Sequence, residues 1–253
     1  MILDSFNLKG KVALVTGCNT GLGQGMALAL AQAGCKVVGI NRTKPIETIE
    51  KMNAAGHTFL DLRANLSQLD DIPYIIDQAV IKFGKIDILV NNAGIIRRED
   101  AIDFSEQNWD DVMNINSKTV FFFSQAVAKQ FIAQGHGGKI INIASMLSYQ
   151  GGVRVPSYTA SKSAVMGLTR AMANEWAKHN INVNAIAPGY METNNTEALR
   201  ADAERNSAIL ERIPAERWGT PADVAGSCVF LASNAASYIN GHTIAVDGGW
   251  LAR

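Results

Sequence analysis

Seven short apolar runs alternate with longer segments of helical character, and this alternation constrains the fold more than any other feature of the chain. The predicted strands cover residues 12–16, 36–41, 58–62, 86–91, 138–144, 181–187 and 243–246. The predicted helices cover residues 22–33, 46–54, 68–83, 106–134, 157–179 and 221–232. Strands that are apolar almost throughout are typical of a parallel sheet covered on both faces. We therefore predict an α/β fold, a doubly wound, seven-stranded parallel sheet flanked by helices.

The pattern also predicts where a ligand binds. Ligands of doubly wound sheets lie beyond the carboxyl ends of the strands. Gly17, Asn91, Ser145 and Gly189 lie at or just after the ends of four predicted strands, so we expect them to meet in one crevice. No linker rich in proline, glycine or serine divides the chain, so we expect residues 1–253 to form a single domain. The longest irregular stretch, 189–220, is expected to form a mobile lid.

Three glycines follow the first predicted strand in Thr16-Gly17-Cys18-Asn19-Thr20-Gly21-Leu22-Gly23. Gly17 permits a tight turn, Gly21 allows the backbone to approach a pyrophosphate, and Gly23 allows the helix to pack close to the sheet. The free N–H groups at the start of the next helix attract phosphate. A strand, this turn and a helix together predict a dinucleotide site.

Tyr158 and Lys162 are four residues apart in a predicted helix and so share one face. A free tyrosine has a pKa of about 10, and a nearby cation stabilises its phenolate. The pair can therefore serve as an acid/base group near neutral pH. The same spacing also occurs on ordinary helix surfaces, so it indicates a catalytic pair only when the other motifs are present. Ser145, at the end of a buried strand thirteen residues earlier, is one of these.

In their order along the chain, the glycine motif, Asn91-Asn92-Ala93-Gly94, Ser145, Tyr158, Lys162 and Pro188-Gly189 resemble the short-chain dehydrogenase/reductase family. The resemblance runs from Leu8 to Gly249 and implies a Rossmann-type fold and hydride transfer with a nicotinamide dinucleotide. It implies that Tyr158 is the general acid/base, that Lys162 lowers its pKa and binds the nicotinamide ribose, and that Ser145 orients the substrate oxygen. Asn116, rather than nearby Asn114, matches the fourth catalytic position, which holds a relay water.

The resemblance also implies a set of cofactor-binding residues drawn from the whole chain. They are Gly17, Asn19, Thr20, Gly21, Leu22, Gly23, Asn41, Arg42, Asn65, Leu66, Asn92, Ala93, Gly94, Tyr158, Lys162, Pro188, Gly189 and Thr193.

The choice between NAD and NADP depends on the end of the second strand. An acidic residue there binds the 2′-hydroxyl and repels a 2′-phosphate, but this chain has Asn41 followed by Arg42. Asn41 does not repel phosphate and Arg42 could bind it, which leans slightly to NADP. The resemblance implies NAD, which we predict, with NADP left open. Asn65 replaces an aspartate that usually faces the adenine, which predicts a weaker contact.

Residues 95–100, 145–154 and 247–253 resemble bacterial sugar-acid dehydrogenases of the family that act in pectin and uronate breakdown. A guanidinium can bind a carboxylate through two parallel hydrogen bonds. We expect Arg98 first, and Arg154 second, to hold the substrate carboxylate near Ser145 and Tyr158; surface ion pairs with Glu99 and Asp100 are the alternative. Three alternative functions remain: gluconate 5-dehydrogenase, 3-oxoacyl-carrier-protein reductase and a non-catalytic dinucleotide sensor.

Composition bears on partners and location. The formal net charge is zero, which gives no reason to expect nucleic acid or a membrane as a partner. The three cysteines lack disulfide or metal spacing, the four histidines are scattered, and no secretory signal is visible, so we expect a cytoplasmic protein without a metal site.

Small residues at 160, 164, 167 and 171 of the Tyr158 helix allow close helix approach, and the resemblance implies a homotetramer.

Overall fold

A seven-stranded parallel sheet forms the centre of the computed structural model, which describes residues 1–253. The strands follow the order β3-β2-β1-β4-β5-β6-β7 across the sheet. Their bounds are β1 Val12–Thr16, β2 Lys36–Asn41, β3 Phe59–Arg63, β4 Ile88–Asn91, β5 Gly138–Ile143, β6 Ile181–Pro188 and β7 Thr243–Val246. The predicted doubly wound sheet is confirmed, and the strand bounds differ from the predicted ones by at most two residues.

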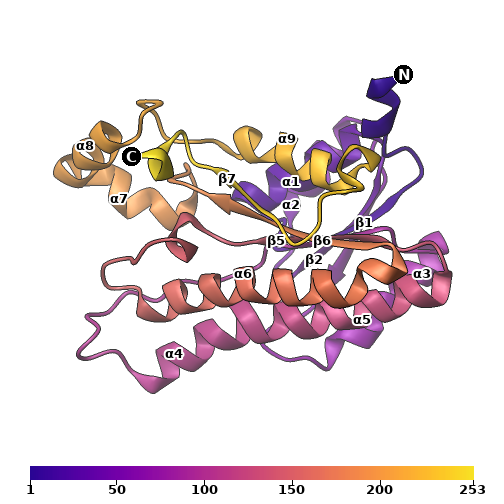
Figure 1. Cartoon of the computed structure of the whole chain (residues 1–253), viewed down its shortest axis with the longest axis horizontal. Coiled ribbons are helices and arrows are strands. Elements are labelled where there is room, and N and C mark those ends of the chain that lie inside the picture. The colour runs from indigo at the N-terminus through magenta and orange to yellow at the C-terminus, as the bar shows by residue number, and fades with distance from the viewer.

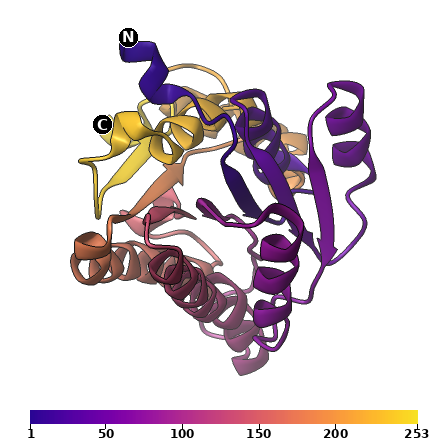
Figure 2. The same ribbon diagram turned by 90° about the vertical axis from the view of Figure 1, so that its right-hand side faces the viewer.

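Helices cover both faces of the sheet (Figures 1 and 2). The α-helices are α1 Gly21–Gln32, α2 Ile46–Ala54, α3 Asp71–Phe83, α4 Glu106–Met113, α5 Thr119–Gln134, α6 Pro156–Trp176, α7 Glu197–Ala201, α8 Ala203–Arg212 and α9 Pro221–Ala232. Short 3₁₀ turns lie at Ile2–Phe6, Met146–Ser148, Ala177–His179, Asn194–Thr196, Asn234–Ala236 and Trp250–Ala252. No helix combines the length and the apolar content needed to cross a membrane.

Two apolar clusters, one on each face, explain why the strands are apolar throughout. Residues of α1 and α9 pack on one face, with Met26, Leu30 and Cys228 fully buried. Residues of α3, α5 and α6 pack on the other, where Phe123 and Phe131 are fully buried. Burying such side chains contributes about 1.5–3 kcal/mol each. Because both faces are covered in this way, the functional side chains are confined to the strand ends.

The predicted single helix over 106–134 is wrong, since the structure divides it into α4 and α5. A π-helical turn, Asn114–Lys118, separates the two. Its extra residue per turn brings Asn116 to a fully buried position. Single π turns inside α-helices are frequent at functional sites. Periodicity missed this turn because one wide turn barely alters the apolar spacing.

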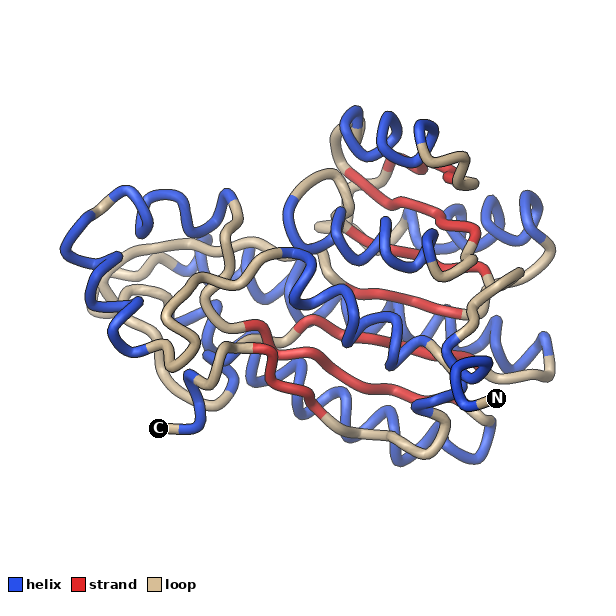
Figure 3. Tube along the Cα trace, turned by 90° about the horizontal axis from the view of Figure 1, so that it is seen from above, coloured by secondary structure: helices blue, strands red, loops and turns tan.

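The stretch 189–220 is not irregular, because it contains α7 and α8. These helices and the C-terminal turn form a lobe beyond the carboxyl ends of the strands (Figure 3). An apolar cluster joins the lobe to the sheet through Met146, Ile209, Ile213, Trp218 and Trp250. The Arg212 guanidinium also stacks on the Trp250 ring at 4.0 Å. The α8 sequence is too polar overall for this packing to be read from it.

Candidate active site

A cleft of about 350 Å³ lies at the carboxyl ends of the strands, beside the point between β1 and β4 where the strand order reverses. Of the predicted cofactor residues, all but Pro188 and Gly189 line it. The cleft is also lined by residues that the sequence analysis missed: Ile40, Thr43, Ala64, Ser67, Ile95, Ile115, Ile143, Asn194 and Asn195. Most of these are neighbours in sequence of a predicted residue, and that adjacency was the available signal.

The glycine turn has the geometry that its sequence predicts. Gly17 and Gly21 have φ values of +65° and +57°, which disfavour side chains. A Cβ on Gly23 would lie 2.1 Å from the Gly17 carbonyl oxygen. The first N–H groups of α1 have no acceptor within the helix and point into the turn. The arrangement suits a pyrophosphate at the N-terminus of α1.

Hydrogen bonds join the glycine turn to the end of β4. Backbone N–H groups of Asn92 and Ala93 each donate to Thr16 Oγ1 at 2.9 Å. Asn92 Nδ2 donates to the carbonyl oxygens of Thr16 and Gly17 at 3.0 and 2.9 Å. Asn92 therefore fixes the turn as well as lining the cleft.

The adenine-ribose end of the cleft contains one unsatisfied polar atom. Asn41, at the end of β2, is 3% exposed; its Nδ2 lies 3.5 Å from Cys18 Sγ, and its Oδ1 has no partner. Arg42 is exposed at the rim. Asn65 Oδ1 accepts from Ser67 N and Oγ at 3.2 and 2.9 Å, so this amide shapes its own turn.

Tyr158 and Lys162 lie together in the cleft on α6, which begins with Pro156. Lys162 Nζ is 5.7 Å from the centre of the Tyr158 ring and donates to the Ile143 carbonyl oxygen at 2.6 Å. Ser145 follows β5, and its Oγ accepts from Leu147 N at 3.1 Å. The segment that follows β5 and the first two turns of α6 thus bring all three side chains together.

Burial, rather than the lysine, controls the acidity of this tyrosine. Burial raises the pKa of Tyr158, while hydrogen bonding with Ser145 and the positive charge of Arg98 lower it. Burial also lowers the pKa of Lys162 to about 8. A lysine with this pKa is still mainly charged at pH 7, so the expectation that Lys162 lowers the pKa of Tyr158 stays a prediction.

Asn116 is fully buried in the π-helical turn and holds the loop after β4. Its Nδ2 donates to the Ile95 carbonyl oxygen and to Ser161 Oγ, at 2.9 and 3.1 Å, and its Oδ1 accepts from Ile95 N at 2.9 Å. A Cβ on Gly94 would lie 3.0 Å from Asn116 Oδ1 and 3.7 Å from Lys162 Nζ. These contacts bring Asn116 close to Lys162 and leave its amide engaged by the protein.

The two arginines predicted to hold the substrate carboxylate, Arg98 and Arg154, have different surroundings, as does neighbouring Arg97. Arg98 Nη2 donates to the Asn195 carbonyl oxygen at 2.9 Å, and its charge reaches Tyr158. Arg154 has φ +63°, and its Nε pairs with Asp100 at 2.8 Å on the exposed surface. Arg97 pairs with Asp111 at 3.3 Å. Neither Arg98 nor Arg154 lines the cleft itself. Arg98 contacts Asn195, which does line it, and is close enough to Tyr158 to affect its pKa, whereas Arg154 forms the surface ion pair of the alternative interpretation.

Pro188 ends β6 and Gly189 follows it, and neither residue lines the cleft. Gly189 N donates to the Val246 carbonyl oxygen, and a Cβ on Gly189 would lie 2.6 Å from Asp247 Cα. Thr193, four residues on, does line the cleft. The structure contains no cluster of three His, Cys, Asp or Glu side chains able to hold a metal ion.

Known proteins with this fold and these motifs are similar along the whole chain. Residues 17–251 match a family model described as enoyl-(acyl carrier protein) reductase. The chain belongs to the short-chain dehydrogenase/reductase family and is an oxidoreductase that uses a nicotinamide dinucleotide.

Individual similar proteins have activities narrower than the family description. The chain is 72% identical to 2-dehydro-3-deoxy-D-gluconate 5-dehydrogenase of Escherichia coli strain K12, over 100% of both chains. A crystal structure from Agrobacterium tumefaciens, described as a candidate 2-deoxy-D-gluconate 3-dehydrogenase with bound NADP, is 56% identical with a TM-score of 0.94, over 99% of this chain and 100% of that one. Gluconate 5-dehydrogenase of Burkholderia cenocepacia, in complex with NADP and tartrate, is 38% identical with a TM-score of 0.94 over 100% of both.

Proposed function

We propose that this protein interconverts the C5 hydroxyl of 2-dehydro-3-deoxy-D-gluconate and the corresponding ketone, with NAD(H), in the breakdown of pectin and uronates. The observation that carries the proposal is the meeting of Tyr158, Lys162 and Ser145 at the catalytic end of a dinucleotide cleft. The 72% identity over the full length of a relative with that activity supports this substrate over gluconate, for which the similarity reported above is 38%.

Proton transfer would occur at the Tyr158 hydroxyl. In oxidation the phenolate takes the proton from the substrate hydroxyl, and in reduction the phenol returns it. Ser145 Oγ orients the same oxygen and stabilises its developing charge. Lys162 and Asn116 position the tyrosine and the loop after β4. When bound, the nicotinamide accepts or supplies the hydride.

We propose a modest preference for NAD. The unpartnered Oδ1 of buried Asn41 is an acceptor that needs a donor. Once the Asn41 side chain turns toward the cleft, a ribose 2′-hydroxyl can donate to this oxygen, whereas an ionised 2′-phosphate cannot. Arg42 works in the opposite direction, because an exposed guanidinium can pair with phosphate, and two similar proteins hold NADP. Shape and one hydrogen bond therefore give a weaker preference than an acidic residue would.

The lobe of α7 and α8 is proposed to act as a lid within a single domain, residues 1–253. Arg98 already joins the loop after β4 to the turn that leads into this lobe, through the Asn195 carbonyl oxygen. A carboxylate that enters the cleft could take over that guanidinium and draw the lobe and the loop together. Arg98 would then be both the anchor and the closing contact.

We further propose a cytoplasmic homotetramer. The outer face of α6 is exposed at Gly167 and Ala171, and no protein atom lies within 4 Å of a Cβ built on Gly167. Phe122, on neighbouring α5, is 38% exposed. Exposed small side chains with an aromatic side chain on the neighbouring helix suit close packing against a second copy. The three cysteines are free and buried, which fits a reducing compartment.

A substrate panel tests the activity. The chain is assayed with 2-dehydro-3-deoxy-D-gluconate, D-gluconate and a 3-oxoacyl thioester, each with both cofactors. We expect the highest kcat/KM for the first compound with NAD, and a sharper NAD preference in Asn41→Asp. A higher kcat/KM for gluconate or the thioester would assign the runner-up activities, and a lack of turnover with all three would favour a sensor.

Arg98→Ala tests the carboxylate anchor. We expect kcat/KM for the hexonate to fall at least tenfold, equivalent to about 1.4 kcal/mol or more, with incomplete rescue by Arg98→Lys because an ammonium binds only as a point charge. Arg154→Ala is the matched control, since its guanidinium pairs with Asp100. Equal activity of the Arg98→Ala variant and the wild type would remove Arg98 from the site.

A further inference from the structure

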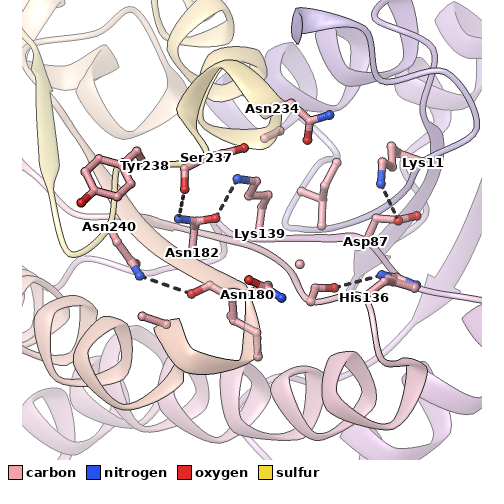
Figure 4. Close-up of a pocket in the computed structure, with 16 residues that line it drawn as sticks. Lys11, Asp87, His136, Lys139, Asn180, Asn182, Asn234, Ser237, Tyr238 and Asn240 are labelled. Atoms are coloured by element: carbon pink, nitrogen blue, oxygen red, sulfur yellow. Dashed lines mark hydrogen bonds and ion pairs between the residues drawn. The ribbon is translucent and has the colours of Figure 1, made fainter.

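A second cavity, of about 630 Å³, lies at the opposite edge of the sheet, where the strands begin (Figure 4). It is lined by Lys11 and Asp87 just before β1 and β4, by Lys139 and Asn182 at the starts of β5 and β6, and by Tyr238 beyond α9. It shares no lining residue with the dinucleotide cleft. Its volume falls within the range of about 300–1,000 Å³ typical of sites for small molecules.

The only carboxylate in the lining is already neutralised. Asp87 is 4% exposed, and its carboxylate pairs with Lys11 and with Lys85, each at 3.1 Å. It also accepts from Val12 N at 2.9 Å. Asp87 therefore has no capacity left to balance another cation in the cavity.

Lys139 is the cation without a counter-charge. Its Nζ donates to Asn182 Oδ1 at 2.7 Å, and no carboxylate pairs with it. Asn182 is itself held by the Ser237 and Ile239 carbonyl oxygens. Burial and the charge of Lys11 lower the pKa of Lys139 to about 8. An anion beside this ammonium would relieve both costs.

Neutral hydrogen-bonding groups surround the cations. Asn180, Asn234, Ser237 and Tyr238 line the cavity, and their side chains are exposed to solvent without a hydrogen bond to the protein. Amide and hydroxyl groups together with an exposed aromatic ring are suited to sugar hydroxyls. A purely structural role for the lysines would offset the negative ends of α5 and α6; the exposed amides and hydroxyls beside them are in addition free to bind a ligand that enters from solvent.

We propose that this cavity binds a small hydroxylated organic anion, a sugar acid or a sugar phosphate, with its anionic group on Lys139 and its hydroxyls on the surrounding amides and hydroxyls. The site is separate from the catalytic cleft, so the inference does not depend on the proposed function.

Calorimetric titration of the cofactor-free protein tests this, with D-gluconate, glucose 6-phosphate, inorganic phosphate and neutral D-glucose as probes. We expect at least one hydroxylated anion to bind at pH 7 and D-glucose not to bind. Lys139→Met should weaken that binding at least tenfold while keeping catalytic turnover. Lys129→Met, which removes an exposed lysine of α5, and Arg98→Ala should each bind within twofold of wild type.

A proton measurement separates an ionic contact from a general effect on folding. Lys11, Lys85, Asp87 and His136 also face or adjoin the cavity, so only the difference between wild type and Lys139→Met is interpreted. At pH 8, binding should take up protons in the wild type and not in the variant. Binding of gluconate alone or glucose 6-phosphate alone would identify the source of the ligand. The proposal is overturned if neither anion binds, if inorganic phosphate binds as tightly, if Lys139→Met binds as wild type, or if Arg98→Ala abolishes binding.

Discussion

At the scale of single residues, Tyr158 and Lys162 occupy an environment that favours their neutral forms. Both are desolvated, and Ser145 and Arg98 only partly offset this for the tyrosine. A buried group whose charged form is disfavoured destabilises the fold, yet such groups are common at functional sites because catalysis needs shifted pKa values. This conflict between stability and catalysis can be measured separately on each side chain.

Tyr158→Phe should abolish hydride transfer while dinucleotide affinity stays within a few-fold. Phenylalanine keeps the packing of the ring and removes only the oxygen that would move the proton. Steady-state rates and cofactor titration check the two halves. Positioned acid/base catalysis is typically worth ~10²–10⁴, so a variant that keeps more than about a hundredth of the wild-type kcat would refute the role.

Lys162→Met should stabilise the protein at pH 7 more than at pH 10.5. The folded pKa of about 8 lies below the ordinary value of 10.5, so between these values the unfolded chain binds more protons and native stability rises with pH. Below pH 8 the full cost applies, on the order of 3 kcal/mol at 1.36 per unit. Denaturant unfolding at pH 7 and pH 10.5 measures the difference in unfolding free energy between the variant and the wild type. An equal difference at both pH values would show that burial does not perturb this lysine.

At the scale of elements, the connection from β1 to α1 determines how close a dinucleotide can approach. The helix packs so tightly that Gly23 has no room for a side chain, and Asn92 at the end of β4 reinforces the same turn. The π-helical turn with Asn116 supports the loop beyond β4 in a similar way. Close helix packing and two side-chain amides bonded to the backbone thus position one cleft.

Gly23→Ala should weaken dinucleotide binding at least tenfold and lower thermal stability. Its Cβ would lie 2.1 Å from the Gly17 carbonyl oxygen and 2.4 Å from Asn92 Nδ2, so the helix must move away from the turn. Gly226→Ala, on the open surface of α9, is the control and should bind as wild type. Cofactor titration and thermal unfolding measure both variants; wild-type affinity in Gly23→Ala would mean that the turn tolerates the shift.

At the scale of the whole molecule, the two edges of the sheet have different characters. The carboxyl edge carries the dinucleotide cleft and the α7–α8 lobe, and the amino edge carries the lysine-lined cavity. The outer face of α6 is covered by neither. Its small side chains leave it free for contact with another copy.

Light scattering should give a mass four times the chain mass of 27.2 kDa. Gly167→Glu should reduce this mass and the activity together, because it places a charge on the α6 face without a clash inside the subunit. Ile81→Glu, at a position 76% exposed on α3, is the control and should leave the tetramer intact. A fully active wild-type monomer would contradict the proposal.

The sequence by itself determined the sheet, its helical layers and the glycine turn, because these depend on local apolar patterning and on backbone freedom that short segments encode. It also indicated the family, and most residues of the cleft followed from that resemblance. Only the tertiary structure decided the surroundings of individual charges. The sequence ranked Arg98 ahead of Arg154 by resemblance only, and the structure gives the physical difference: the charge of Arg98 lowers the pKa of Tyr158, whereas Arg154 pairs with Asp100. The same holds for the perturbed Lys162, the π turn and the cavity around Lys139, since desolvation and charge pairing arise between segments far apart in the chain.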